Sequence, residues 1–299
     1  MSETLTHFYP LAGKIKDELS TDSNDEGAYY METQVNCHLS EFLRKPDLLL
    51  GNQLFPCDLL PTESTAVTYV ANFQVNVFEC GGIAICICIS HRIVDGAALS
   101  TCIKAWSATA KGSKEAIMYP EFFSSSLFPA NDMGIRDSAI VMFGSLLKKG
   151  QCMAKRFVFD ASAISNLKAQ TASLGVKCPT RIELQNTQIS PKPGLEDLVG
   201  EVRKAISEID SDFVENIKGG KGNAQMDETL KGIGAFDSRD VVDYLGFSSC
   251  CKFSFYDFDF GWGNPVWVSS FGLSCSLTLN LIFLVDTRCD SIEAFCDFG

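Results

Sequence analysis

Histidine is scarce in this chain, which contains only His7, His38 and His91. Cysteine is abundant, but none of the 13 cysteines forms a C-x-x-C pair, and the adjacent Cys250 and Cys251 lack metal-ligand spacing. We therefore expect no metal site. A signal peptide of basic and then apolar residues is missing, as is any Asn-x-Ser/Thr acceptor. These absences predict a cytoplasmic protein with free thiols.

Clustered basic residues and long apolar runs are lacking as well. The formal net charge is −12, whereas a broad nucleic-acid surface needs clustered Lys and Arg. No apolar run approaches the ~20 residues of a membrane helix. We therefore expect neither nucleic acid nor a membrane as a partner. An anionic small molecule can still bind where a few basic groups and backbone N–H donors converge.

Three common catalytic loops are also missing. The chain has no G-x-S-x-G elbow of a serine hydrolase and no G-x-x-x-x-G-K-[ST] phosphate loop. No G-x-G-x-x-G follows a strand, so dinucleotide binding lacks its signature. The chemistry has to be carried by another arrangement of residues.

The segment before residue 91 predicts a β-hairpin. Apolar residues alternate over residues 67–77, Gly81 and Gly82 supply a turn, and a buried run follows. After Gly96 the apolar period becomes helical. His91 is thus predicted at the end of a rigid strand, just before a turn into a helix. Functional residues often lie at such junctions.

The remaining patterns predict an α/β protein. Residues 154–159 read as a strand, with Asp160 as the N-cap of a helix that ends at Gly175. Residues 195–209 form an amphipathic helical pattern. Residues 251–272 read as strand, Gly-rich loop and strand, and residues 277–285 as a further strand.

His91 has two interpretations. A lone histidine beside apolar residues is commonly a partly buried side chain without a chemical role. An imidazole at a strand end can also act as a general base near neutral pH. Asp95 could orient the imidazole or could fasten the turn through a basic partner, and spacing alone does not decide between them. His7 and His38 have no comparable context.

A second motif lies in the sequence DFDFGWGNP, from Asp257 to Pro265. Gly261 and Gly263 flank Trp262 in a tight loop that follows Asp259. Glycines in such a loop commonly serve backbone geometry, so a structural role is the first interpretation.

Together the two motifs resemble the BAHD family of plant acyl-CoA-dependent acyltransferases. The H-x-x-x-D-G motif of the family is matched by residues 91–96, and D-F-G-W-G by residues 259–263. HFYPLAGKIKD near the start and NLIFLVDTRCDSIEAF near the end are similar to the flanking segments of the family. LEDLVGEVRKAISEID is similar to the branch that includes vinorine synthase.

The resemblance implies two chloramphenicol-acetyltransferase-like α/β halves, with mixed sheets flanked by helices and a solvent channel between them. The expected division places an N-terminal half over residues 1–175 and a shortened crossover linker over 176–194. A partial C-terminal half over 195–299 follows. The chain looks shortened at both ends and between VKCPTRIE and NTQISPKP, so the second half is expected to be incomplete.

The resemblance also implies the activity. The chain would transfer an acyl group, expected to be acetyl, from acyl-CoA to a hydroxyl of a plant specialised metabolite such as an alkaloid or alcohol. His91 would be the general base. Asp95 of the same catalytic motif would point away from the substrates and hold the loop in an ion pair with an arginine. Asp259 is sometimes assigned a catalytic role in the family, but a structural role is the first expectation. Gly261, Trp262 and Gly263 would lie on the coenzyme A side. No permanently bound cofactor is implied, only acyl-CoA as co-substrate, and the protein is expected to be a monomer.

The shortened sequence leaves two alternatives open. The chain could be a catalytically inactive paralogue that binds a ligand or a full-length relative. It could also represent an incomplete gene model.

Overall fold

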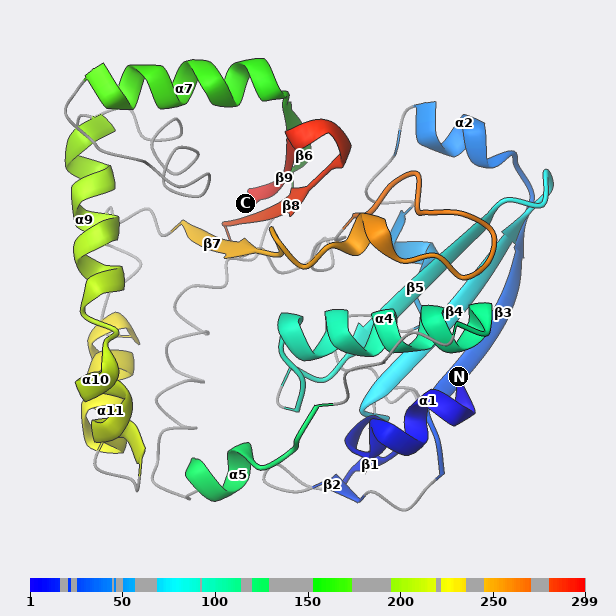
Figure 1. Cartoon of the computed structure of the whole chain (residues 1–299), viewed down its shortest axis with the longest axis horizontal. Coiled ribbons are helices and arrows are strands. Elements are labelled where there is room, and N and C mark those ends of the chain that lie inside the picture. The colour runs from blue at the N-terminus through cyan, green and yellow to red at the C-terminus, as the bar shows by residue number, and fades with distance from the viewer. Residues whose placement is uncertain are drawn as a thin grey trace. The chain divides into compact units, whose positions relative to one another are not determined.

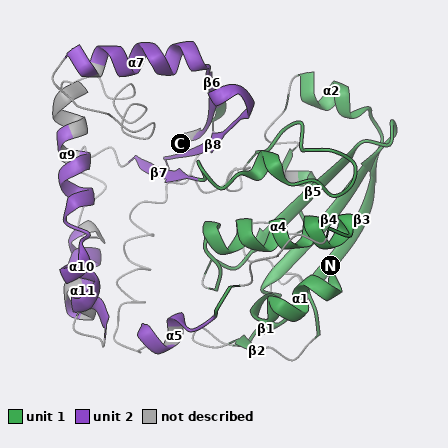
Figure 2. Ribbon diagram, in the orientation of Figure 1, with its two compact units in different colours: residues 1–121, 150–155, 250–278 green, residues 122–149, 156–249, 279–299 purple. Residues whose placement is uncertain are grey.

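The chain forms two compact units, each assembled from segments far apart in the sequence (Figure 2). Unit 1 comprises Met1–Glu121, Gly150–Lys155 and Cys250–Thr278, and unit 2 comprises Phe122–Lys149, Arg156–Ser249 and Leu279–Gly299. The computed structural model describes residues 1–16, 21–22, 26–44, 46, 51–56, 69–91, 93–113, 120–128, 153–173, 195–218, 222–234, 245–269 and 280–298.

The chain returns to unit 1 after residue 249. Residues 259–263 lie in the same unit as His91, although the linear division placed the two motifs in different halves. The expected linker, residues 176–194, lies outside the described residues.

A mixed three-stranded sheet forms the centre of unit 1 (Figure 1). Strands β3 (Tyr29–Val35) and β4 (Ala71–Phe78) are parallel, and β4 is antiparallel to β5 (Ile83–Ile89). The predicted hairpin is thereby confirmed. A small antiparallel pair, β1 (Lys14–Ile15) and β2 (Thr21–Asp22), lies earlier in the chain.

Helix α4 (Gly96–Lys111) packs on this sheet, with the Trp106 ring 5.4 Å from the ring of Phe73 on β4. The helix predicted after Gly96 is therefore confirmed. α4 also contacts α1 (Ser2–His7). The remaining short elements of unit 1 are η1 (Tyr9–Leu11), α2 (Leu39–Arg44) and η2 (Asn52–Leu54).

A row of buried amides occupies the face of β4 opposite Phe73, because alternate strand residues point to opposite faces. Asn72, Gln74 and Asn76 are all buried there. Gln74 donates to Asn76 at 2.8 Å, and Asn76 donates to the carbonyl of Leu54 at 2.9 Å. These bonds pair the Gln74 and Asn76 amides, which would otherwise be costly to bury, and they fix the segment around Leu54 against the sheet. The Oδ1 of Asn72 is buried without a hydrogen-bond partner among the described residues.

The segment from Cys250 to Ser269 differs from its prediction, because no strand follows residue 249 there. Its one regular element is η5 (Phe255–Asp257). Lys252, Ser254, Gly261 and Gly263 all have positive φ angles, which are incompatible with an extended strand. The aromatic rings of this segment pack partly on one another, as Phe255 does on Phe253 and Phe258. Others pack on the rest of unit 1, as Phe260 does on Trp106.

Unit 2 contains a four-stranded sheet in the order β6-β9-β8-β7. β6 (Met153–Phe159) begins in unit 1 and continues into unit 2, and β7 (Gly246–Ser249) is parallel to β8 (Leu281–Asp286). β9 (Ile292–Phe298) is antiparallel to β8 after the turn η6 (Arg288–Asp290). The strands over residues 154–159 and 277–285 were predicted in outline, but β9 was not.

The helices of unit 2 agree in part with the sequence pattern. Asp160 caps α7 (Ala161–Ser173) by accepting from the amide of Ala163 at 2.7 Å, as predicted. α9 (Leu195–Ser207) corresponds to the amphipathic pattern, and α5 (Ser124–Leu127) and α10 (Ser211–Ile217) are short. α11 (Gly222–Gly234) follows α10 in the chain.

None of the nine cysteines among the described residues forms a disulfide. Burial raises the pKa of the Cys86 and Cys102 thiols to about 12, so both pack as small apolar groups. Within the described ranges no cluster of potential metal ligands occurs, and no helix there is long and apolar enough to span a bilayer.

Gly96, the first residue of α4, allows the helix to pack closely against the segment from Cys250 to Ser269. A Cβ added at Gly96 would lie 2.6 Å from Cε2 of Phe253, so the ring has to move. We expect Gly96→Ala to lower the free energy of unfolding by about 1–2 kcal/mol. Urea unfolding measures this change. Gly200→Ala on α9, where the Cβ meets nothing within 4 Å, is the control and raises stability by up to ~1 kcal/mol. Equal midpoints for Gly96→Ala and the unchanged chain would contradict the packing.

Candidate active site

His91 follows the last residues of β5 in a tight turn. The amide of Ser90 donates to the carbonyl of Val70 at 2.8 Å, and the Ser90 carbonyl accepts from the amides of Ile93 and Val94. These bonds fix the backbone on both sides of His91. The His91 side chain is exposed, and within the described part of the chain its imidazole has no hydrogen-bond partner. A rigid backbone thus presents an imidazole that a substrate can reach.

Asp95 begins helix α4. Its backbone is extended, and its Oδ1 accepts a hydrogen bond from the amide of Ala98 at 2.7 Å. This is an N-cap, which satisfies one of the free donors of the first helical turn. Among the described residues Asp95 makes no contact with the His91 ring, and Arg92 lies outside them. The geometry therefore associates Asp95 with fastening the turn rather than with orienting the imidazole.

Asp259 is the centre of the second motif. Its Oδ1 accepts from the amides of Gly261 at 2.8 Å and Gly263 at 3.0 Å, and its Oδ2 accepts from Nζ of Lys111 at 2.6 Å. Lys111 is the last residue of α4. The hydrogen bond from Lys111, followed by those from the two glycine amides, lowers the pKa of Asp259 to about 2. The carboxylate is therefore ionised at neutral pH, and its hydrogen bonds with the two glycine amides hold the loop in a turn.

Gly261 and Gly263 are needed for this arrangement, because both have φ near +99°, a conformation that other residues rarely adopt. With Asp259 inside the turn, the Trp262 side chain between them points outward and is 69% exposed.

A ladder of aromatic rings connects the second motif to the sheet. The Phe260 ring lies 4.9 Å from Trp106 of α4 in an edge-to-face contact, and Trp106 meets Phe73 in the same manner. Trp262 stacks on the other side of Phe260, with centroids 6.0 Å apart and planes inclined by 20°. Edge-to-face and stacked pairs are the favoured aromatic geometries. The two motifs are therefore joined through α4.

A comparison with protein families identifies the fold. Residues 1–186 and 193–295 match the model of the Transferase family. The chain belongs to this family. The BAHD resemblance drawn from the two motifs is thereby confirmed, and with it the enzyme class, an acyltransferase.

Individual relatives are similar over most of their length. The chain is 34% identical to epi-neemfruitin B 7-O-acetyltransferase of Melia azedarach, covering 96% of this chain and 76% of the relative. It is 30% identical to (13S,14R)-1,13-dihydroxy-N-methylcanadine 13-O-acetyltransferase of Papaver somniferum, covering 100% and 80%. The crystal structure of vinorine synthase matches with a TM-score of 0.73 at 25% identity, covering 99% of this chain and 79% of that one. The predicted fold class is confirmed.

The alignments also reveal an internal difference. The alignment with the Melia enzyme spans 344 positions, more than the 299 residues of this chain. The relative therefore has residues within the aligned region that have no counterpart here. The family match is interrupted at residues 187–192, within the segment NTQISPKP that borders the internal loss suggested by the sequence.

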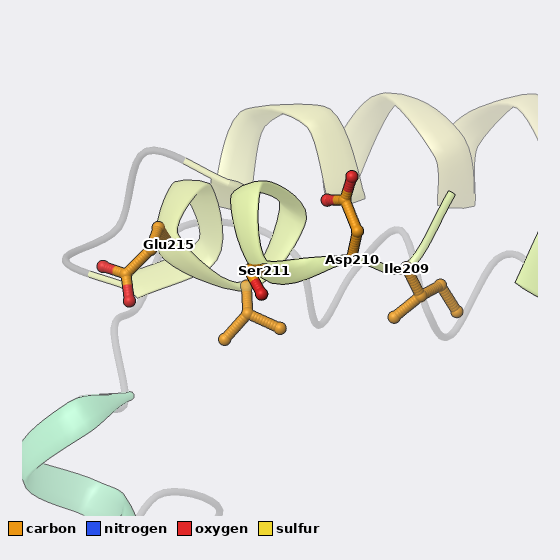
Figure 3. A pocket seen from close by; sticks show the side chains of 5 residues that line it. Ile209, Asp210, Ser211 and Glu215 are labelled. Carbon is orange, nitrogen blue, oxygen red and sulfur yellow. The ribbon is translucent and has the colours of Figure 1, made fainter. Parts of the chain in front are cut away.

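An open surface hollow lies in unit 2 (Figure 3). Ile209, Asp210, Ser211, Val214 and Glu215 line it. Two of the five side chains are acidic, which opposes an anionic ligand, and the Asp210 carboxylate already caps α10 by accepting from the amide of Phe213 at 2.9 Å. None of these residues belongs to either motif. The acidic side chains that line this hollow do not favour binding of the anionic acyl-CoA.

Sequence reasoning missed Lys111, Trp106 and Phe73 as parts of the site. Lys111 pairs with a residue 148 positions away, and no local pattern predicts such a contact. The one available signal was a basic residue in the last turn of a predicted helix, which by itself indicates only a favourable interaction with the helix dipole.

The low pKa of Asp259 predicts a pH-dependent stability difference. The folded carboxylate titrates near 2, below the value of about 3.9 in an unfolded chain. Its ionised form therefore stabilises the fold above about pH 4, and this contribution disappears as the pH falls through about 2. Asp259→Asn should be less stable than the unchanged chain at neutral pH and equally stable near pH 2. Urea unfolding at several pH values and fixed ionic strength tests this. A difference that stays constant with pH would contradict it.

Proposed function

We propose that this chain transfers an acetyl group from acetyl-CoA to an alcohol of a plant specialised metabolite, with His91 as the general base. The observation that carries the proposal is the geometry of His91, an exposed imidazole on a fixed turn in a chain of the Transferase family. Its neighbours in the turn have structural roles, since Val94 is buried and Asp95 caps α4.

The proposed reaction needs one base and no covalent enzyme intermediate. His91 accepts the proton of the acceptor hydroxyl as its oxygen attacks the thioester carbonyl. A carbon–oxygen bond forms, and the tetrahedral oxyanion requires hydrogen-bond donors. The carbon–sulfur bond then breaks, and the leaving coenzyme A thiolate takes the proton from His91. An imidazole is suited to both transfers because its unperturbed pKa is near neutrality.

The other predicted site residues have supporting roles in this proposal. Asp95 positions the His91 turn by capping α4, and Asp259 shapes the loop of the second motif. Gly261, Trp262 and Gly263 form the part of that loop proposed to meet the coenzyme. Asp259 is a structural rather than a proton-transferring group, because Lys111 and two amides already occupy its oxygens.

The acceptor class follows from the relatives. One is named as an epi-neemfruitin B 7-O-acetyltransferase, and another as acetylating a hydroxyl of a dihydroxy-N-methylcanadine. A polycyclic alcohol of the limonoid or alkaloid kind is therefore the proposed acceptor, and acetyl is the proposed acyl group.

A second candidate is a protein that binds acyl-CoA or a small alcohol without turnover. The observation in its favour is the internal difference, because the relatives carry aligned residues that this chain lacks. Binding without product formation would distinguish this candidate.

A mass-spectrometric assay of the purified chain tests the proposed function. The chain is incubated with acetyl-CoA and a panel of limonoid and alkaloid alcohols, and acetylated products are sought together with free coenzyme A thiol. We expect at least one alcohol to be acetylated in step with thiol release. Thiol release without an acetylated product, or no reaction while a full-length relative acetylates the same panel, would contradict the proposal.

A further inference from the structure

Helix α4 spans the distance between the two motifs. Its N-terminus is capped by Asp95 of the first motif, and its C-terminus ends at Lys111, which binds Asp259 of the second. Its 16 residues correspond to about 24 Å of rigid helix. Any residue that fixes the second motif to α4 also fixes it relative to the turn of His91.

Lys111 and the glycine amides use different oxygens of Asp259. Nζ of Lys111 donates to Oδ2, whereas the amides of Gly261 and Gly263 donate to Oδ1. Lys111 therefore leaves Oδ1 available and holds the carboxylate plane in the orientation in which Oδ1 meets both amides. Hydrogen bonds between charged groups are stronger than neutral ones, and the Asp259 side chain is only 25% exposed.

The aromatic ladder restrains the same loop in a second way. Phe260 packs against Trp106, and Trp262 stacks on Phe260. These contacts hold the rings of the loop against α4, but they do not fix the backbone turn at Gly261 and Gly263. The turn is held by Asp259, whose orientation depends on Lys111. The exposed Trp262 side chain thus has a defined direction only while both restraints are present.

From this geometry we propose that Lys111 is a positioning residue for acyl-CoA. It acts through Asp259 to preorganise the loop of Gly261, Trp262 and Gly263, so that the loop is already in its binding conformation when the coenzyme arrives. This inference rests on the proposed function. Preorganisation raises affinity by removing the cost of ordering the loop on binding, so loss of Lys111 should affect coenzyme affinity much more than the chemical step.

Three variants test the role of Lys111. Lys111→Met removes the charge and keeps the length of the side chain, and Lys111→Arg keeps a donor that can reach the carboxylate. Lys104→Met is the matched control, because Lys104 is an exposed lysine on the same helix without an ion pair among the described residues. Titration calorimetry gives the Kd for acetyl-CoA, steady-state assays give KM and kcat, and hydrogen exchange reports on the amides of residues 259–263.

For Lys111→Met we expect Kd and KM for acetyl-CoA to rise about tenfold while kcat changes less than about twofold. The amides of Gly261 and Gly263 should exchange faster. Lys111→Arg should restore both properties, and Lys104→Met should behave as the unchanged chain.

Unchanged affinity and exchange in Lys111→Met would overturn the inference. Equal weakening by Lys104→Met would overturn it as well, because general attraction between lysine and the anionic coenzyme would then explain the loss. So would failure of Lys111→Arg to restore binding. If the unchanged chain binds no acetyl-CoA, the proposed function itself fails. If the unchanged chain and Lys111→Met bind acetyl-CoA with the same affinity, only the inference about Lys111 fails.

Discussion

Replacement of His91 by alanine is expected to lower acyl transfer by about 10²–10⁴-fold, the usual contribution of a general base. The loss should appear in kcat, because the imidazole acts on the proton during attack and does not hold the coenzyme. His91 is exposed, and the backbone hydrogen bonds of its turn are made by Ser90, Ile93 and Val94, so we expect the fold to tolerate loss of the ring. Product formation measured by mass spectrometry gives the rate.

The control for this variant is His38→Ala. His38 is also exposed and lies outside both motifs, and its recorded hydrogen bonds are made by its backbone. We expect full activity from His38→Ala and unchanged melting temperatures from both variants. An active His91→Ala enzyme would remove the base from the proposed mechanism. A large fall in its melting temperature would mean that His91 is structural.

Replacement of Arg156 by alanine is expected to lower the free energy of unfolding by about 2 kcal/mol. Arg156 of β6 donates from Nε to Oε2 of Glu293 at 2.9 Å and from Nη2 to Oε1 at 2.5 Å. Glu293 of β9 is only 5% exposed, and a buried carboxylate without its partner is costly. The pair joins β6 to its neighbouring strand in the sheet of unit 2. Urea unfolding gives the change in stability.

Lys155→Ala is the matched control for Arg156→Ala. Lys155 is the adjacent residue, is exposed, and makes no ion pair within the described ranges. Its replacement should change stability by less than about 0.5 kcal/mol. Adding Glu293→Gln to Arg156→Ala should recover part of the loss, because the uncompensated charge is then gone. If Arg156→Ala and Lys155→Ala are equally stable, the pair does not stabilise the sheet.

Local patterns predicted the parts of the fold that depend on local physics. Alternating apolar residues and a glycine turn indicated β4 and β5, and the helical period after Gly96 indicated α4. Asp160 was identified as a cap because aspartate before a helical pattern accepts the first free amides. The two motifs identified the family because their residue types and order are specific.

Contacts between segments far apart in the sequence could not be predicted from local patterns. The stretch over residues 251–272 was predicted to contain strands, but its described residues contain none. Its aromatic rings pack on one another, as Phe255 does on Phe253, and on other parts of unit 1. The pairing of Lys111 with Asp259 and the edge-to-face contact of Phe260 with Trp106 depend on the return of the chain to unit 1. Neither contact can be predicted from a local sequence pattern.

Thermal unfolding with and without acetyl-CoA tests the central claim most directly, because it needs no knowledge of the acceptor. A ligand that binds only the folded chain adds about 2.7 kcal/mol of stability at a hundredfold excess over its Kd. Acetate at the same concentration serves as the control. The proposed function predicts a cooperative transition that rises with acetyl-CoA and not with acetate. A cooperative transition at the same temperature with and without acetyl-CoA would mean that this chain has no coenzyme site, and would contradict its assignment as a working acyltransferase.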